Sequence, residues 1–304
     1  MKKILLFGKN GQVGWELQRS LAPLGELIAL SSTSLDYCGD LTNSEGIRQT
    51  IRKVAPDIIV NAAAYTAVDK AESEPESAHA LNALAPGIIA QEAKQLNAWL
   101  VHYSTDYVFN GYGDQPFLET DATEPLNVYG KTKLEGEKNI QTSGCLHLIF
   151  RTSWVYSAYG NNFIKTILRL AQQRDKLTVV DDQIGSPTGA ELIADITAFA
   201  LLEIIKHNPA VSGLYHLTAR DSTSWYGFAK FILENAERNN MPLKTKPATL
   251  HPITSNDFPL PAKRPLNSRL NSQKLVTTFN LLPPTWQIGA ARTLAEIFTN
   301  DGWK

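Results

Sequence analysis

The first half of the sequence alternates short apolar segments with longer amphipathic ones, and this alternation restricts the fold more than any other feature. The amphipathic stretch "WELQRSLAPL" has the apolar spacing of a helix. Strand-length, mostly apolar segments occur at residues 4–8, 26–30, 57–63, 100–109 and 147–156. Strands that alternate with helices indicate βαβ units, and continuous apolar strands are typical of a parallel sheet covered on both faces. The sequence therefore predicts an α/β fold with a doubly wound, Rossmann-type parallel sheet.

The second half of the chain is less regular, which indicates a second unit. The chain has 304 residues, more than the roughly 100 to 200 of one typical domain. We expect a first domain over residues 1–155 and a smaller α/β domain mainly over residues 156–304. Within that second range, "AELIADITAFALLEII" (190–205) predicts a helix and "GLYHLT" (213–218) a strand. We therefore expect residues 190–218 to return to the first domain, so that the two domains interleave.

Composition and charge disfavour several classes of partner. No apolar run approaches the roughly 18 residues of a membrane-spanning helix, and Gly8 ends the N-terminal apolar run too early for a secretory signal. A net charge of −1 does not indicate nucleic acid or an anionic membrane. Cys38 and Cys145, without a CxxC spacing, fit a reducing cytoplasm. We expect a cytoplasmic protein whose partner is a small molecule.

A glycine-rich loop, "GKNGQVG", lies between the first predicted strand and the first predicted helix. Gly8 permits a tight turn, Gly11 lets the backbone approach a pyrophosphate, and Gly14 lets the helix pack closely on the strand. The N-terminus of the helix then offers free N–H groups and a positive dipole to phosphates. The loop predicts that the first domain binds a dinucleotide, with NADPH or NADH as the cofactor.

The end of the second strand bears on the choice between these two cofactors. NAD enzymes commonly carry an acidic residue there, but this chain has "ALSSTS" with Ser31 at the expected position. Nothing there repels a 2′-phosphate and no arginine stands nearby to bind one, so both cofactors are admitted. Asp40 and Leu41 in "GDLTN" are predicted to contact the cofactor, Asp40 through a hydrogen bond to the adenine. The alternative is that Asp40 caps the helix that begins near Asn43.

Two stretches, "YGKTK" and "YGFAK", place a tyrosine four residues before a lysine at the start of a predicted helix. Residues i and i+4 share one helix face, where an ammonium favours the phenolate and makes tyrosine a usable proton donor. Tyr129 and Lys133 follow a strand at the edge where parallel sheets bind ligands. Tyr226 and Lys230 lie in the second half, beside apolar residues spaced like a buried helix face, namely Trp225, Phe228, Ala229, Ile232 and Leu233. The first pair is therefore the predicted catalytic pair.

A hydroxyl at the end of the preceding strand completes the predicted catalytic group. The segment "HYSTDYVF" brings Thr105 to the same sheet edge, where its hydroxyl can reach the oxygen that Tyr129 protonates. The alternative is that Thr105 is an ordinary β-branched strand residue with a satisfied hydroxyl.

These motifs give the chain a resemblance to the extended short-chain dehydrogenase/reductase family. In sequence order they are "GKNGQVG", "NAAAYTAVD", "YSTDYVF" and "YGKTK", and further motifs such as "SPTGAEL" and "RPLNSRL" extend the resemblance over nearly the whole chain. The resemblance implies an enzyme that uses reduced nicotinamide to reduce the C4 keto group of a 4-keto-6-deoxy sugar nucleotide. It implies that Tyr129 donates the proton, that Lys133 lowers the pKa of Tyr129 and binds the cofactor ribose, and that Thr105 hydrogen-bonds the same substrate oxygen.

The resemblance also implies roles in binding. Trp154 and Asp106 would contact the sugar, although a tryptophan there could equally be a core aromatic. Arg264 would pair with the nucleotide diphosphate, for which Arg269 is the alternative. Further residues implied to contact the cofactor are Gln12, Val13, Ala64, Tyr65 and Thr66.

Three glutamates match positions that hold a magnesium ion at a dimer interface in some members of the family. They are Glu16, Glu191 and Glu296. Carboxylates are ligands that magnesium prefers, but three solvated helix residues would look the same. The resemblance thus implies a possible homodimer and a possible Mg²⁺ site.

Three rival functions belong to relatives of the same fold. A sugar-nucleotide 4,6-dehydratase usually carries Asp-Glu directly after the threonine, whereas here Asp106 is followed by Tyr107, so elimination lacks its expected base. A 4-epimerase would retain its NAD. A regulatory subunit of methionine adenosyltransferase binds a nucleotide without turnover, but the presence of Tyr129, Lys133 and Thr105 together favours an enzyme.

Overall fold

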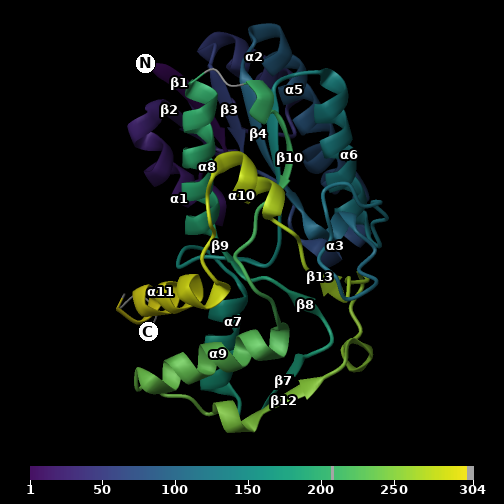
Figure 1. The fold of residues 1–304 in the computed structure, drawn as a ribbon, viewed down its shortest axis with the longest axis vertical. Coiled ribbons are helices and arrows are strands. Elements are labelled where there is room, and N and C mark those ends of the chain that lie inside the picture. The colour runs from purple at the N-terminus through teal and green to yellow at the C-terminus, as the bar shows by residue number, and fades with distance from the viewer. Residues whose placement is uncertain (207–208, 300–304) are drawn as a thin grey trace.

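The structure, a computed structural model, describes residues 1–206 and 209–299 and has a parallel six-stranded sheet at its centre (Figure 1). The strand order is β10-β5-β4-β3-β1-β2, with all neighbours parallel. The order reverses direction between β1 and β3, which makes a topological switch point there. The predicted doubly wound α/β sheet is confirmed. Its strands are β1 Lys2–Phe7, β2 Gly25–Leu30, β3 Ile58–Asn61, β4 Trp99–Thr105, β5 His147–Thr152 and β10 Gly213–His216.

Helices cover both faces of the sheet. Successive residues of a strand point to opposite faces, and in these strands the residues on both faces are mostly apolar. On β1, Ile4 and Leu6 pack into one core and Leu5 and Phe7 into the other. The first face carries α1 Gln12–Leu21, α8 Ala190–Ile205 and α10 Gln273–Phe279, and the second carries α2 Ser44–Val54, α5 Ala85–Leu96 and α6 Val128–Ser143. Between β3 and α5 the chain forms α3 Val68–Ser73, α4 Pro75–His79 and a π-helical turn Ala80–Leu84.

The rest of the second half forms a smaller α/β unit with its own core around Phe228 and Trp286. Figure 1 shows it below the carboxyl edge of the sheet. Its helices are α7 Phe163–Gln173, α9 Trp225–Arg238 and α11 Trp286–Thr299, and its main strands are the parallel pair β7 Leu177–Val180 and β12 Leu250–Ile253. Short strands connect the two parts: β6 Val155–Tyr156, β8 Ile184–Gly185, β9 Thr188–Gly189, β11 Thr223–Ser224 and β13 Asn267–Ser268.

The predicted helix at 190–205 is α8, and the predicted strand at 213–218 is β10, which pairs with β5. The division into a first domain of residues 1–155 together with 190–218, and a second domain mainly of residues 156–304, stays a prediction. Residues 207, 208 and 300–304 lie outside the described residues. In the part of the chain that the structure describes, no helix has the length and apolar character needed to cross a membrane.

Two predicted strands are shorter than expected. The segment 100–109 leaves the sheet after Thr105 and forms a 3₁₀ turn at Asp106–Val108, and the segment 147–156 breaks after Thr152. Trp154 causes the second break, because it takes a left-handed backbone with φ 50°. Gly185 faces its indole, and a Cβ there would lie 2.6 Å from Trp154 Cε2. Buried loops next to the sheet therefore carry apolar residues that the pattern assigned to strands.

A buried ion pair joins α6 to β5. The Arg151 guanidinium donates from Nε and Nη2 to the two carboxylate oxygens of Glu137 at 2.9 and 2.6 Å, and both residues are at most 3% exposed. The guanidinium also lies over the Phe109 ring, 5.0 Å from its centroid. Neither charge has water to replace its partner, so the pair fixes the position of α6 against the sheet.

We expect Arg151→Met to lower the free energy of unfolding by about 3–5 kcal/mol, because it leaves the Glu137 carboxylate buried and unpaired. Urea denaturation measures the change. Arg19→Met, which removes the ion pairs of an exposed arginine with Asp195 and Glu16, is the matched control and should cost less than about 1 kcal/mol. A loss from Arg151→Met as small as that of the control would contradict this interpretation.

Candidate active site

The glycine loop lies at the switch point of the sheet. Gly8 has φ 87° and its N–H donates to Leu30 O at 2.9 Å, and a Cβ on Gly8 would lie 2.6 Å from Ala63 N. A Cβ on Gly14 would lie 2.0 Å from Gly8 O, so helix α1 approaches β1 more closely than any side chain allows. Helix α1 has Gly11 as its N-cap, no side-chain cap and no acidic residue in its first turn. Its N-terminus can therefore receive an anionic group.

A cavity of about 400 Å³ opens beside this loop, at the carboxyl edge of the sheet. It is formed by the loop, the ends of β3, β4 and β5, the start of α6 and residues of the second half of the chain. The structure brings together there most of the residues singled out in the sequence, namely Gln12, Val13, Ala64, Thr66, Thr105, Asp106, Tyr129, Lys133 and Trp154.

Tyr129 is positioned by the first turn of α6. The Asn127 side chain caps this helix and accepts a hydrogen bond from Gly130 N at 2.8 Å. Gly130 leaves no room for a side chain, since a Cβ there would lie 2.2 Å from Tyr107 O. The Tyr129 ring makes an edge-to-face contact with Tyr107, with centroids 5.7 Å apart. The close contact with the turn after β4 holds Tyr129 next to Thr105.

The pKa of Tyr129 is about 12, above its ordinary value. Burial raises it most, the nearby Thr105 hydroxyl opposes this, and the charge of Asp106 adds to the increase. Lys133 is not among the groups that shift this pKa, so the expectation that Lys133 lowers the pKa of Tyr129 stays a prediction. Tyr129 is a neutral phenol at neutral pH, which is the state of a proton donor.

Lys133 lies one helical turn after Tyr129 and is almost fully buried, at 1% exposed. Its Nζ donates to Tyr103 O at 2.6 Å and lies 3.1 Å from His102 Nε2. Burial lowers the pKa of Lys133 to about 8, although the negative charge of Glu137 opposes the decrease. The amine and ammonium forms of Lys133 are thus close in free energy near neutral pH.

Thr105 and Asp106 form the floor of the cavity at the end of β4. Thr105 Oγ1 donates to Asp106 Oδ1 at 3.0 Å and accepts from Tyr107 N at 3.1 Å. Asp106 is 3% exposed, and no side-chain or backbone partner reaches its Oδ2 among the described residues. Burial raises the pKa of Asp106 to about 6, against the lowering effect of the neighbouring Ser268 and Thr105 hydroxyls. Such a carboxylate oxygen can accept a hydrogen bond from a ligand hydroxyl.

Trp154 stacks on Trp225 and forms an apolar wall of the cavity. The two rings are 3.5 Å apart at their centroids and 9° from parallel. The sequence places Trp225 in the buried stripe of helix α9. The structure shows that Trp225 is half-buried against the core of the smaller unit and also lines the cavity, whereas Phe228 and Ile232 of the same helix are fully buried. Its position next to the Ser224 N-cap, at the end of the helix, is the signal that separates it from the stripe.

Asn162 is a second cavity residue that the sequence did not single out. It lines the cavity and caps α7, and its Nδ2 donates to Gln12 Oε1 at 2.9 Å and to Ser157 O at 2.7 Å. Asn162 therefore links the second half of the chain to the glycine loop.

Several residues predicted to bind the cofactor lie outside the cavity lining. Asp40 accepts from Thr42 N and Oγ1 at 3.0 and 2.8 Å, while Asn43, not Asp40, caps α2. Leu41 is buried in the core beneath the second helix layer. Tyr65 donates its hydroxyl to Glu74 at 2.7 Å.

Ser31 is buried just after β2, with its hydroxyl 3.3 Å from that of Thr33. Ser32 and Thr33, which follow it, are exposed, so they are the residues of this turn that solvent and ligands can reach. No carboxylate lies within the turn formed by residues 31–34.

Arg264, the residue predicted to bind the diphosphate, is held by an acidic partner. Its guanidinium donates to both carboxylate oxygens of Asp69 at 2.7 Å and to Ala262 O at 2.7 Å. It is not among the residues that line the cavity. Arg269, the alternative, donates to Asp114 O and Asn267 Oδ1 and lines a different cavity. Asp69 would have to release Arg264 before the arginine could bind a phosphate.

The second tyrosine–lysine pair, Tyr226 and Lys230, lies on helix α9 in the smaller unit. Neither residue lines the cavity. Gly227, which completes the resemblance to the first motif, donates its N–H to the Ser224 cap at 2.9 Å. This "YGFAK" is a capped helix start, as the sequence predicted.

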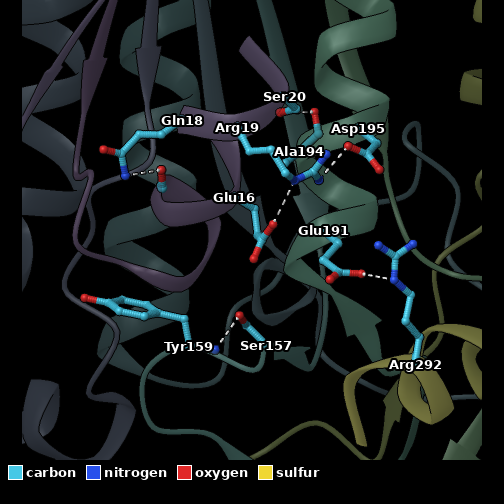
Figure 2. Close-up of polar contacts among 11 residues, drawn as sticks. Glu16, Gln18, Arg19, Ser20, Ser157, Tyr159, Glu191, Ala194, Asp195 and Arg292 are labelled. Carbon is cyan, nitrogen blue, oxygen red and sulfur yellow. Dashed lines mark hydrogen bonds and ion pairs between the residues drawn. The ribbon is translucent and has the colours of Figure 1, made fainter. Parts of the chain in front are cut away.

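The three predicted metal ligands, Glu16, Glu191 and Glu296, line one separate cavity of about 580 Å³ between α1, α8 and α11. Two of them face guanidinium groups, as Figure 2 shows: Arg19 Nε lies 3.4 Å from Glu16 Oε2, and Arg292 Nε lies 3.3 Å from Glu191 Oε2. Over the described ranges 1–206 and 209–299, no group of three His, Cys, Asp or Glu side chains could hold a metal ion. The Mg²⁺ site therefore stays a prediction that this geometry does not support.

Comparison with known proteins gives matches over nearly the whole length of the chain. A family model described as RmlD substrate binding domain matches residues 1–299. The chain is 57% identical to dTDP-4-dehydrorhamnose reductase of Escherichia coli (strain K12) over 296 residues, which cover 97% of this chain and 98% of that protein. It is 42% identical to the protein of the same name from Burkholderia thailandensis, over 98% of this chain and 99% of that one.

A solved structure of dTDP-4-dehydrorhamnose reductase from Bacillus anthracis str. Ames, in complex with NADP, has the same fold. Its TM-score is 0.86 at 34% identity, and the match covers 97% of this chain and 100% of that chain. Both parts of the present structure are therefore included in the likeness.

The buried carboxyl of Asp106 makes the stability of the protein depend on pH. Its pKa in the folded state, about 6, lies above its ordinary value, so its contribution to stability is most favourable below pH of about 4 and falls as the pH rises through 6. We expect Asp106→Asn to raise the free energy of unfolding by on the order of 2 kcal/mol at pH 8 and to have little effect at pH 4.

Urea denaturation of the native protein and the variant at these two pH values measures the difference. Asp36→Asn, at an exposed residue, is the control and should change stability at neither pH. Equal stability of the native protein and Asp106→Asn at pH 8 would refute the effect.

Proposed function

The chain belongs to the RmlD substrate binding domain family, and we propose that it is a dTDP-4-dehydrorhamnose reductase. In this reaction the C4 keto group of dTDP-4-dehydro-6-deoxy-L-mannose is reduced to the hydroxyl of dTDP-L-rhamnose at the expense of NADPH or NADH. The observation that carries the proposal is the convergence of Tyr129, Thr105 and Lys133 on one cavity beside the glycine loop, in a chain 57% identical to a reductase of this name.

The residues around the glycine loop fit a dinucleotide. Gly8 and Gly14 remove the side chains that would separate the loop from the sheet, and the uncapped N-terminus of α1, with Gln12 and Val13, would hold the pyrophosphate. Ala64, Thr66 and Lys133 would hold the part of the cofactor that enters the cavity. The reduced nicotinamide, when bound, supplies a hydride to the carbonyl carbon.

Tyr129 supplies the proton in this proposal. A phenol with a pKa of about 12 keeps its proton until negative charge develops on the carbonyl oxygen, and then transfers it to the forming alkoxide. The Thr105 hydroxyl stabilises the same oxygen, or the phenolate that remains on Tyr129, once its hydrogen turns from Asp106 Oδ1 toward the cavity. Lys133 completes the group by holding a ribose hydroxyl and by placing a titratable amine next to the proton donor.

The stacked Trp154 and Trp225 rings offer the apolar face that a 6-deoxy sugar requires, since its C6 is a methyl group. Asp106 offers a carboxylate oxygen without a partner among the described residues, which can accept from a sugar hydroxyl. We propose these as the substrate contacts. Arg264 is the proposed diphosphate ligand only if it exchanges Asp69 for the substrate.

The position after Asp106 separates this function from a 4,6-dehydratase. Tyr107 packs edge-to-face on Tyr129, and burial raises its pKa well above the ordinary value, so it cannot act as a base that removes a proton from carbon. The regulatory-subunit alternative predicts a protein that binds nucleotide without turnover, and an activity assay decides between the two.

Further features of the proposal concern assembly and location. A sugar nucleotide as the partner follows from the proposed reaction. The homodimer, the absence of nucleic-acid and membrane partners, the cytoplasmic location and the Mg²⁺ ion at Glu16, Glu191 and Glu296 are predictions from the sequence and its family resemblance.

We expect Tyr129→Phe to lower kcat by about 10²–10⁴-fold, because it removes the proton donor and leaves the ring in place. The measurement is the loss of NADPH absorbance in the presence of dTDP-4-dehydrorhamnose. Tyr226→Phe changes the same atom in the other tyrosine–lysine motif and is the matched control, for which we expect native activity.

Cofactor binding by Tyr129→Phe, followed by the fluorescence of NADPH, should stay close to that of the native protein. If the native protein binds NADPH and the substrate causes no oxidation of either cofactor, the reductase function is wrong. If both variants keep native activity, the role of Tyr129 is wrong.

The absence of a carboxylate in the turn after β2 predicts that NADPH is accepted, as in the solved relative that contains NADP. We expect Ser32→Asp, at an exposed residue of this turn, to raise the Kd of NADPH about tenfold by charge repulsion and to change that of NADH less than about threefold. Fluorescence titration measures both constants, with the uncharged Ser32→Asn as control. Equal weakening of the two cofactors would show that the turn does not face the 2′-phosphate.

A further inference from the structure

A chain of buried hydrogen bonds leads from the end of β3 to Lys133, and the proposed chemistry does not use it. Ala63 N donates to Asn61 Oδ1 at 3.1 Å, and Asn61 Nδ2 lies 3.2 Å from His102 Nδ1. His102 Nε2 lies 3.1 Å from Lys133 Nζ, which donates to Tyr103 O at 2.6 Å. Each of the three residues Asn61, His102 and Lys133 is only 1% exposed. Water therefore cannot replace any of these hydrogen-bond partners.

The direction of the chain follows from its first member. A backbone N–H can only donate, so the Asn61 side chain must present its oxygen to Ala63 and its amide nitrogen to His102. The opposite amide orientation would place two donors against each other at Ala63. His102 Nδ1 must therefore accept, and a neutral imidazole then carries its proton on Nε2. Burial keeps the pKa of His102 well below its ordinary value, so the ring is neutral.

This direction has a consequence for Lys133. The Nε2 proton of His102 points at Nζ, and only a neutral amine has a lone pair to accept it. An amine that accepts from His102 and donates to Tyr103 O keeps one further N–H for the cavity that Lys133 lines. An ammonium would place its own N–H against that of His102.

We propose that Asn61 and His102 are positioning residues that hold the Lys133 side chain and favour its neutral amine over its ammonium form. The proposal rests on the function proposed above, in which Lys133 lies beside the proton donor Tyr129.

The charged and titratable groups around Lys133 fit a side chain that is balanced between its two forms. From α6, the Glu137 charge favours the ammonium, but Glu137 is itself paired with Arg151 of β5. From the end of β4, Asp106 lies near Tyr129 and is partly protonated near its pKa of about 6. Burial favours the amine and outweighs Glu137, which agrees with a pKa of about 8 for Lys133. The contact with His102 acts in the same direction as burial.

The sharpest test is Asn61→Asp, which reverses the chain at constant size. An aspartate would accept both from Ala63 N and from His102 Nδ1, so the ring proton would move to Nδ1 and the Nε2 lone pair would face Lys133. We expect the pKa of Lys133 to rise by more than about 1 unit. The measurement is an NMR pH titration of protein labelled with ¹³C at the lysine ε-carbon, with the Lys133 signal identified by its loss in Lys133→Met.

Two substitutions of His102 test the same idea without adding a charge. His102→Leu removes the donor to Nζ and should raise the pKa of Lys133, measured as its titration midpoint, by about half a unit or more. His102→Gln retains an N–H donor and should leave this midpoint close to its native value. If Asn61→Asp does not fold, this pair decides the question. An unchanged midpoint in His102→Leu, or equal shifts in the Leu and Gln variants, would overturn the proposal.

Asn61→Asp both adds a negative charge and reverses the direction of the hydrogen bonds through His102. The double variant that combines Asn61→Asp with His102→Leu separates these two effects. Without the imidazole, the new carboxylate can act only through space. We expect the shift that Asn61→Asp causes to fall to less than about half of its value in the presence of His102. An equal shift with and without the ring would show that charge alone is responsible and would contradict the role of His102.

The titration needs neither substrate nor turnover, so it fails independently of the proposed function. If the reductase assay is silent and the midpoints move as expected, the function is wrong and the positioning role stands. Where activity is present, the pH at which kcat changes should move with the Lys133 midpoint, while KM for the sugar nucleotide changes less than about twofold. A purely structural role of His102 would change kcat without moving its pH profile.

Discussion

The packing of helix α6 against β4 and β5 is the constraint on which the site depends. Tyr129, Lys133 and Glu137 are spaced by four residues and so lie on one face of this helix. Glu137 is fixed by its bidentate bond to Arg151. Gly136 allows the helix to approach the neighbouring π-helical turn, since a Cβ there would lie 2.1 Å from Asn82 O. Neither Tyr129 nor Lys133 can therefore shift without moving the helix away from the sheet.

Burial at this edge of the sheet favours the uncharged forms of Tyr129, Asp106 and Lys133. It raises the pKa of Tyr129 and of Asp106 and lowers that of Lys133. A neutral phenol next to a lysine that is close to losing its proton suits reduction, in which a proton must be given up only when the carbonyl oxygen gains charge. The cost is a fold that carries, among its described residues, a carboxylate oxygen of Asp106 without a partner and a left-handed tryptophan, Trp154.

The sequence predicted what depends on local pattern and missed what depends on partners far along the chain. The apolar strands and the glycine loop were predicted because spacing alone determines them, and Tyr129 was separated from Tyr226 by its place after a strand. The bond of Arg264 to Asp69, 195 residues away, has no local signal. Leu41 and Tyr65 were assigned to the cofactor by resemblance, but one is in the core and the other pairs with Glu74. His102 was hidden inside an apolar strand.

The most direct test of the central claim is the fate of the transferred hydrogen. Incubation of the protein with dTDP-4-dehydrorhamnose and NADPH that carries deuterium at the reactive C4 position of its nicotinamide, followed by NMR of the sugar product, locates the label. The proposed reaction predicts one deuterium on C4 of the dTDP-L-rhamnose formed. A product without deuterium at C4, or no product from a folded protein that binds NADPH, would contradict it.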